Sequence, residues 1–205
     1  MQFKYKSITI KISFLFIAVM LIAVINQNNK LPIILIISAL LHEMGHLVCL
    51  FLTRTKVCAV YFNIFGMKIV KGVNPRTNYW DECKIALMGP LFNIIIFIIA
   101  LTLFFCFKSA IYLKIALVNL FLALFNLLPI FSLDGGSALF FFLASKKSPF
   151  KAHKTVKVIS FVFVIPLIIF GVYQLFSTKY NFTLLLIGLY LITLLIFKNS
   201  KLSPC

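Results

Sequence analysis

The sequence predicts an all-α polytopic membrane protein with about six transmembrane helices and a small interfacial β-hairpin between the second and the third. Hydrophobic residues make up 62% of the 205 residues and charged residues 12%, whereas soluble proteins average roughly 25% charged residues. The mean hydropathy is +1.10. A water-soluble domain is excluded, because so few polar groups could not cover its surface.

The apolar residues gather in stretches long enough to cross a hydrocarbon core of about 30 Å. We expect membrane spans at 8–25, 31–52, 85–107, 110–130, 156–176 and 182–197. The first stretch follows a basic leader like that of a signal peptide. The polar run behind it offers no small-residue cleavage site, so we interpret it as a helix of the mature protein.

The distribution of the positive charges predicts how the chain is oriented in the membrane. The 20 Lys and Arg residues outnumber the 4 acidic residues, for a net charge of +16. With a cytoplasmic N-terminus, all but four of these 20 lie on the cytoplasmic side, the exceptions being Lys30, Lys108, Lys114 and Lys179. The positive-inside rule therefore predicts that both termini are cytoplasmic. Topology accounts for the charge, and aromatic residues do not alternate with the basic clusters, so nucleic-acid binding is not expected.

The segment 56–71 is rich in Val, Ile, Tyr and Phe, which favour strands, and Phe65-Gly66 in its centre favours a turn. We expect a β-hairpin at the cytoplasmic interface, because an open sheet edge cannot face lipid. Such an edge could bind an extended peptide. A purely structural loop with β character is the alternative.

Ionisable residues stand in the apolar stretch 31–52, where they are costly unless they serve a function. His42 and His46 are spaced by four residues, so on a helix they present two imidazoles to one ion, with Glu43 beside them. In the pattern H-E-x-x-H, the imidazoles bind zinc and the carboxylate takes a proton from water. A solvated salt-bridged helix, the usual alternative, is incompatible with an apolar span.

A catalytic zinc ion needs a third protein ligand. Apart from Glu43, the acidic residues are Asp81, Glu82 and Asp134. Asp81 and Glu82 precede a span, where they would offset a helix dipole. Asp134 follows an apolar span and a break at Pro129. In the predicted topology, Asp134 and the two histidines all lie toward the cytoplasmic half and can converge.

Four other residues are weaker candidates. Cys49 lies on nearly the same helix face as His42, but a packing role is commoner for a buried Cys. His153 stands in a basic segment, where we expect a solvated side chain. Asn93 and Asn126 lie in apolar runs, where an amide needs partners, and each could contact substrate or join helices.

These motifs together resemble the site-2 protease family of intramembrane zinc metallopeptidases, peptidase family M50. HEMGH at 42–46, GPLFN at 89–93, NLLP at 126–129 and LDGG at 133–136 resemble its motifs in order and spacing. The resemblance covers roughly residues 30–140 and is closest to the compact sporulation type that releases a sigma factor from its pro-sequence. The chain departs from the family pattern at a few positions, which are Met67, Phe131, Ser132 and Ser137.

The resemblance implies a zinc metalloendopeptidase in a bacterial cell membrane, acting on a membrane-associated or transmembrane substrate such as a pro-sigma or anti-sigma factor. We expect a single domain over 1–205, because the chain leaves no room after the sixth span for the CBS or PDZ domain that many relatives carry. Regulation is then expected from elsewhere, with a regulatory membrane protein as a further partner. The implied roles are zinc ligands His42, His46 and Asp134, general base Glu43, and substrate-binding Asn93 and Asn126. The alternatives are a metal transporter and a catalytically inactive scaffold.

Overall fold

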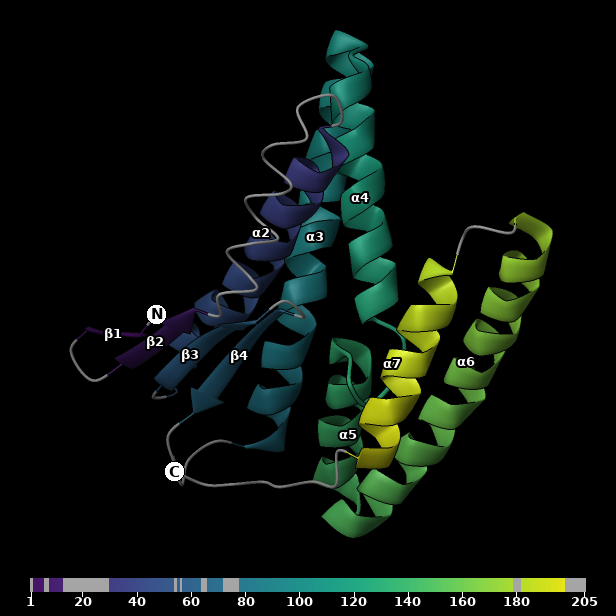
Figure 1. Cartoon of the computed structure of the whole chain (residues 1–205). Coiled ribbons are helices and arrows are strands. Elements are labelled where there is room, and N and C mark those ends of the chain that lie inside the picture. The colour runs from purple at the N-terminus through teal and green to yellow at the C-terminus, as the bar shows by residue number, and fades with distance from the viewer. Residues whose placement is uncertain are drawn as a thin grey trace. The chain divides into compact units, whose positions relative to one another are not determined.

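The computed structural model of the chain describes residues 2–5, 8–12, 30–53, 55, 57–63, 66–71, 78–178 and 182–197. Within these ranges it contains four strands and six helices (Figure 1). The strands are β1 (Gln2–Tyr5), β2 (Ile8–Ile12), β3 (Val57–Asn63) and β4 (Gly66–Lys71). The helices are α2 (Leu31–Leu52), α3 (Tyr79–Phe107), α4 (Ala110–Asn126), α5 (Asp134–Lys146), α6 (Pro149–Thr178) and α7 (Thr183–Phe197).

The chain divides into two compact units. The first unit contains the four strands, α2, the part of α3 from Met88 onward, and α4 up to Phe125. The second unit contains Asn78, the start of α3 up to Leu87, Asn126 at the end of α4, and the helices α5, α6 and α7.

The predominantly helical class predicted from the sequence is confirmed, with differences at helix ends. Helix α2 has the predicted bounds. Helix α3 begins at Tyr79 rather than at 85, with two carboxylates in its first turn that offset the helix dipole. Helix α4 ends at Asn126 rather than at 130, because Pro129 cannot continue a helix. Helix α5 was not predicted as a separate element.

Three helices are long and apolar enough to cross a membrane, by length and composition. They comprise α2, α3 and the part of α6 from Pro149 to Ser177. Helices α4 and α7 are apolar but shorter. These helices agree with an integral membrane protein, whereas the number of six spans stays a prediction.

The strands form one sheet in the order β1-β2-β3-β4 (Figure 1). The predicted hairpin is present, since β3 pairs with β4 in antiparallel register from Val57↔Lys71 to Asn63↔Gly66. The prediction of a helical span from residue 8 is wrong for Ile8–Ile12, which form β2 and pair in parallel with β3. This pairing joins distant segments and has no local sequence signal. The rest of the predicted first span, 13–25, lies outside the described residues, as does Phe65.

In the first unit, α2 packs closely against α3 because Gly45 has no side chain. A Cβ atom on Gly45 would lie 2.7 Å from the Met88 carbonyl oxygen and 3.0 Å from the Phe92 ring. Small residues at such crossings let the backbones of membrane helices approach. A hydrogen bond also ties α4 to α2, since the Asn119 amide donates to the Ser38 hydroxyl at 2.9 Å. The helix that carries the histidines thereby contacts both α3 and α4.

In the second unit, α6 and α7 lie side by side and meet at two glycines (Figure 1). A Cβ atom on Gly171 of α6 would lie 2.8 Å from the backbone nitrogen of Leu185, and Gly188 of α7 faces Ile168. The start of α3 packs on α5 through a small core of Cys83, Ala86 and Ala138.

Candidate metal centre

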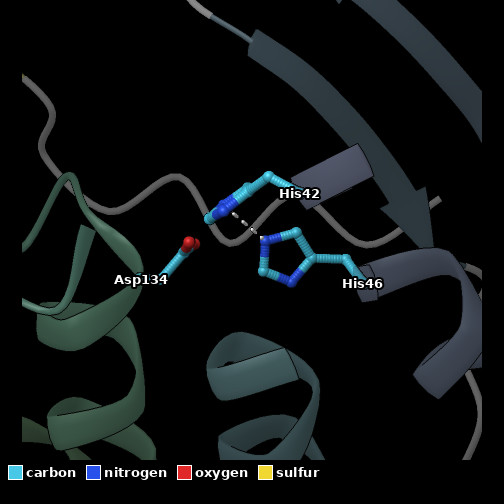
Figure 2. A group of neighbouring side chains, drawn as sticks. All are labelled: His42, His46 and Asp134. Atoms are coloured by element: carbon cyan, nitrogen blue, oxygen red, sulfur yellow. Dashed lines mark hydrogen bonds between the residues drawn. The ribbon is translucent and has the colours of Figure 1, made fainter. Parts of the chain in front are cut away.

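The two histidines predicted as metal ligands lie one turn apart on α2 and point to the same place (Figure 2). His42 is 6% exposed and His46 is 8% exposed. Their Nε2 atoms lie 3.3 Å apart, and their rings meet edge to face with centroids 5.0 Å apart. The spacing predicted from the sequence is therefore realised as a pair of buried imidazoles.

The separation of the two nitrogens fits a shared zinc ion. With zinc–nitrogen bonds of about 2.0–2.1 Å and a tetrahedral angle, two imidazole nitrogens on one zinc lie about 3.3–3.4 Å apart. The observed Nε2–Nε2 distance is 3.3 Å. The pair also satisfies itself without metal, because one Nε2–H can donate to the other Nε2. The rings need no change of spacing between these two states.

Helix α3 makes room for both rings at Gly89. A Cβ atom on Gly89 would clash with His46 Nε2 and would lie 2.6 Å from His46 Cε1 and 2.7 Å from His42 Nε2. Pro90, the next residue, is fully buried. Only a glycine therefore allows this turn of α3 to lie against the imidazoles.

One turn further along α3, Asn93 contacts His42. The Asn93 side chain is completely buried, and its Nδ2 atom lies 3.2 Å from His42 Nδ1. Of the residues predicted from the sequence, the structure of the first unit thus brings together His42, His46 and Asn93. Glu43, predicted as the general base, is next to His42 on α2 and is half-buried.

In the second unit, Asp134 is the first residue of α5 and is half-buried. Leu133 before it is extended, and the Ser137 N–H bonds to the Leu133 carbonyl at 3.0 Å. A Cβ atom on Gly135 would clash with the Leu127 carbonyl, and one on Gly136 would clash with the Ile130 carbonyl. The two glycines thus let the loop before α5 pack on the first turn of the helix.

A serine of α6 holds the same loop. The Phe131 N–H donates to the Ser160 hydroxyl at 2.8 Å, and this hydroxyl lies 2.7 Å from the Val156 carbonyl and 3.3 Å from the Pro129 carbonyl. Ser160 and Ile130 are completely buried. Backbone groups freed by the break at Pro129 are thus satisfied inside protein, which the membrane interior requires.

Three side chains, His42, His46 and Asp134, each offer one nitrogen or oxygen atom that could bind a metal ion (Figure 2). Both imidazole nitrogens and carboxylate oxygens are ordinary zinc ligands. Asn126, predicted to bind substrate, is the last residue of α4 and is half-buried.

Asp81 and His153, which were not predicted as metal ligands, make other contacts. Asp81 pairs with Lys84 at 3.4 Å in the first turn of α3, as expected for a residue that offsets a helix dipole. The expectation of a solvated His153 is wrong: it is half-buried, and its ring meets that of Phe131 edge to face with centroids 4.9 Å apart. The ring of Phe140 also meets that of His153 edge to face, with centroids 6.5 Å apart.

Sequence reasoning missed the buried contact of Asn119 with Ser38. Asn119 is completely buried in an apolar run of α4. The signal that singled out Asn93, an amide among apolar residues, was present at Asn119 as well.

Comparisons with known proteins agree with these motifs. A family model described as peptidase family M50 matches residues 108–167. A zinc metalloprotease of Methanocaldococcus jannaschii is 29% identical over 193 residues, which cover 89% of this chain and 55% of that protein. The chain thus spans about half the length of this curated relative. The solved site-2 protease from Methanocaldococcus jannaschii is similar with a TM-score of 0.68 and 26% identity, covering 94% of this chain and 92% of that one.

Proposed function

Because this chain belongs to peptidase family M50, we propose that it is an intramembrane zinc metalloprotease that cleaves a membrane-associated or transmembrane protein. The proposed zinc ligands are His42, His46 and Asp134, and the proposed general base is Glu43. The observation that carries the proposal is the buried histidine pair, with Nε2 atoms 3.3 Å apart on an apolar helix. Two imidazoles this close, in a span where ionisable groups are costly, are best explained by a shared cation.

Hydrolysis of a peptide bond at this site would combine the chemistry of a bound zinc ion with proton transfers by Glu43. When bound, zinc supplies Lewis-acid polarisation of the scissile carbonyl and acidifies the attacking water. Glu43 accepts a proton from this water as the water oxygen attacks the carbonyl carbon. Glu43 then delivers the proton to the leaving amine as the carbon–nitrogen bond breaks. Because the two imidazoles are buried, bulk solvent screens the charges that develop during the reaction only weakly.

The substrate must present an extended backbone, because a helix hides its carbonyls in hydrogen bonds. In the described sheet, β4 is the last strand and pairs only with β3. We propose that this edge and Asn126 hold the unwound segment of the substrate. Replacing leucines beside the cleaved bond of a reporter with glycine should then speed cleavage, because glycine weakens a helix. Equal rates for both reporters would contradict the need for unwinding.

We further propose that both termini are cytoplasmic and that the natural substrate is released from the membrane, as a pro-sigma or anti-sigma factor would be. The distribution of the lysines and arginines supports this orientation. Reporter fusions that are active only in the cytoplasm test it, because activity at either end requires that end to be inside. A silent but well-expressed fusion would contradict the orientation.

The assignment of Glu43 is tested with purified protein in detergent. The variant Glu43→Gln should retain zinc and lose cleavage of membrane-tethered reporters by about 10²- to 10⁴-fold or more, because the amide cannot accept the proton. The matched control is Glu82→Gln, the same change in the first turn of α3, which should leave cleavage unchanged. A Glu43→Gln variant that still cleaves would contradict the assignment of Glu43 as the general base. Zinc uptake into vesicles without cleavage by the wild type would favour a transporter instead.

A further inference from the structure

The buried side-chain amide of Asn93 lies beside His42, and only one of its two polar atoms has a hydrogen-bond partner among the described residues. Its Nδ2 atom is 3.2 Å from His42 Nδ1. Its Oδ1 atom is buried and has no hydrogen-bond partner within the described residues. Since Asn93 is completely buried, bulk water does not reach this oxygen.

The two ends of an amide are interchangeable by rotation about one bond, and the hydrogen-bond network decides between them. In one orientation, the amide N–H donates to His42 Nδ1, which leaves the imidazole proton on Nε2. In the other orientation, Oδ1 faces His42 and accepts a hydrogen bond from Nδ1–H. The imidazole proton then lies on Nδ1, and Nε2 carries a lone pair. Only the second orientation makes Nε2 a metal ligand.

We propose that Asn93 is a positioning residue of the metal centre, whose Oδ1 accepts a hydrogen bond from His42 Nδ1–H and thereby directs the His42 Nε2 lone pair toward zinc. The inference rests on the proposed zinc site. Histidine ligands of zinc donate their second N–H to a carboxylate, a carbonyl or water, which fixes the tautomer and the ring orientation. The side-chain carbonyl of Asn93 plays this part for His42.

The placement of Asn93 on α3 supports this role. Gly89 and Asn93 are spaced by four residues and lie on one face of the helix, the face that meets the imidazoles. Gly89 leaves space for the rings, and Asn93 orients one of them. Complete burial against His42 also distinguishes Asn93 from a residue that contacts substrate, so the role implied for it by family resemblance is replaced.

The test compares zinc affinities of full-length variants in detergent by competition with a chelator. Asn93→Leu removes the acceptor while retaining the branched shape of the side chain, and it should weaken zinc binding by about 10- to 100-fold. Asn93→Asp retains the acceptor and lacks the donor, so it should bind zinc within about threefold of the wild type. The matched control Asn119→Leu changes another completely buried amide that contacts Ser38 and not a histidine, and it should leave zinc affinity unchanged.

The outcomes separate this inference from the proposed function. If Asn93→Asp loses affinity as Asn93→Leu does, the amide acts as a donor and the inference is overturned. If Asn119→Leu loses affinity equally, the effect is general packing, which also overturns it. If the wild type binds no zinc, the proposed zinc site itself fails. The visible spectrum of the cobalt-loaded protein gives a second readout, expected to change in Asn93→Leu and not in Asn119→Leu.

Discussion

Gly89 and His42 lie so close together that a Cβ atom built on Gly89 would be 2.7 Å from the Nε2 atom of His42. The histidine pair is therefore shaped by the backbone of α3 as well as by its own helix. Substituting alanine at this glycine must displace at least one imidazole ring, because the neighbouring atoms belong to the rings themselves.

We predict that Gly89→Ala weakens zinc binding strongly, by overpacking that costs about 1–3 kcal/mol, or roughly 5- to 160-fold. Chelator competition measures it. The control is Gly188→Ala on α7, where the atoms nearest to an added methyl group belong to Ile168 and not to a histidine. An unchanged zinc affinity in Gly89→Ala would show that the rings do not bind the ion from these positions.

We predict that single substitutions of the proposed ligands, His42→Ala, His46→Ala and Asp134→Ala, each abolish stoichiometric zinc binding. Loss of one of three protein ligands removes a large share of the binding free energy. Metal analysis of the purified variants tests this. His153→Ala removes a histidine that packs on Phe131 and serves as control, with zinc content expected to equal that of the wild type. Full zinc content in Asp134→Ala would remove Asp134 from the ligand set.

We predict that Ser160→Ala lowers the free energy of unfolding by about 1–3 kcal/mol, because it leaves the Phe131 N–H without its acceptor at 2.8 Å. Thermal unfolding in detergent measures the change. Ser145→Ala, which removes a hydroxyl bonded to the Phe142 carbonyl of its own helix, should change stability much less. Equal effects of the two substitutions would argue against a special role of Ser160 in holding the loop before Asp134.

We predict a coupling between Ser38 and Asn119 of about 0.6 kcal/mol and at most about 1.7 kcal/mol, the average and the maximum for hydrogen bonds between membrane helices. The two residues bond at 2.9 Å across α2 and α4. A double-mutant cycle with Ser38→Ala and Asn119→Leu, read by unfolding, measures the coupling. Strictly additive effects would mean that this bond contributes nothing to the packing of α2.

Much of the fold and of the site could be predicted from local patterns. The bounds of α2 follow from a predominantly apolar stretch of 22 residues, and the hairpin of β3 and β4 follows from two short strand-forming runs. The pairing of β2 with β3 could not be predicted, because it joins segments far apart in the sequence. A basic apolar segment reads equally well as the start of a membrane helix, which is why Ile8–Ile12 were assigned wrongly.

The sequence by itself determined that His42 and His46 share a helix face, because the helical period places residues four apart one above the other. It also marked Asp134 and Asn93 as polar residues in apolar surroundings. Tertiary structure alone decided what Asn93 contacts and why position 89 must be glycine, since both depend on how closely α3 approaches α2. Periodicity along one helix cannot specify that distance, because it is set by the side chains missing at Gly45 and Gly89.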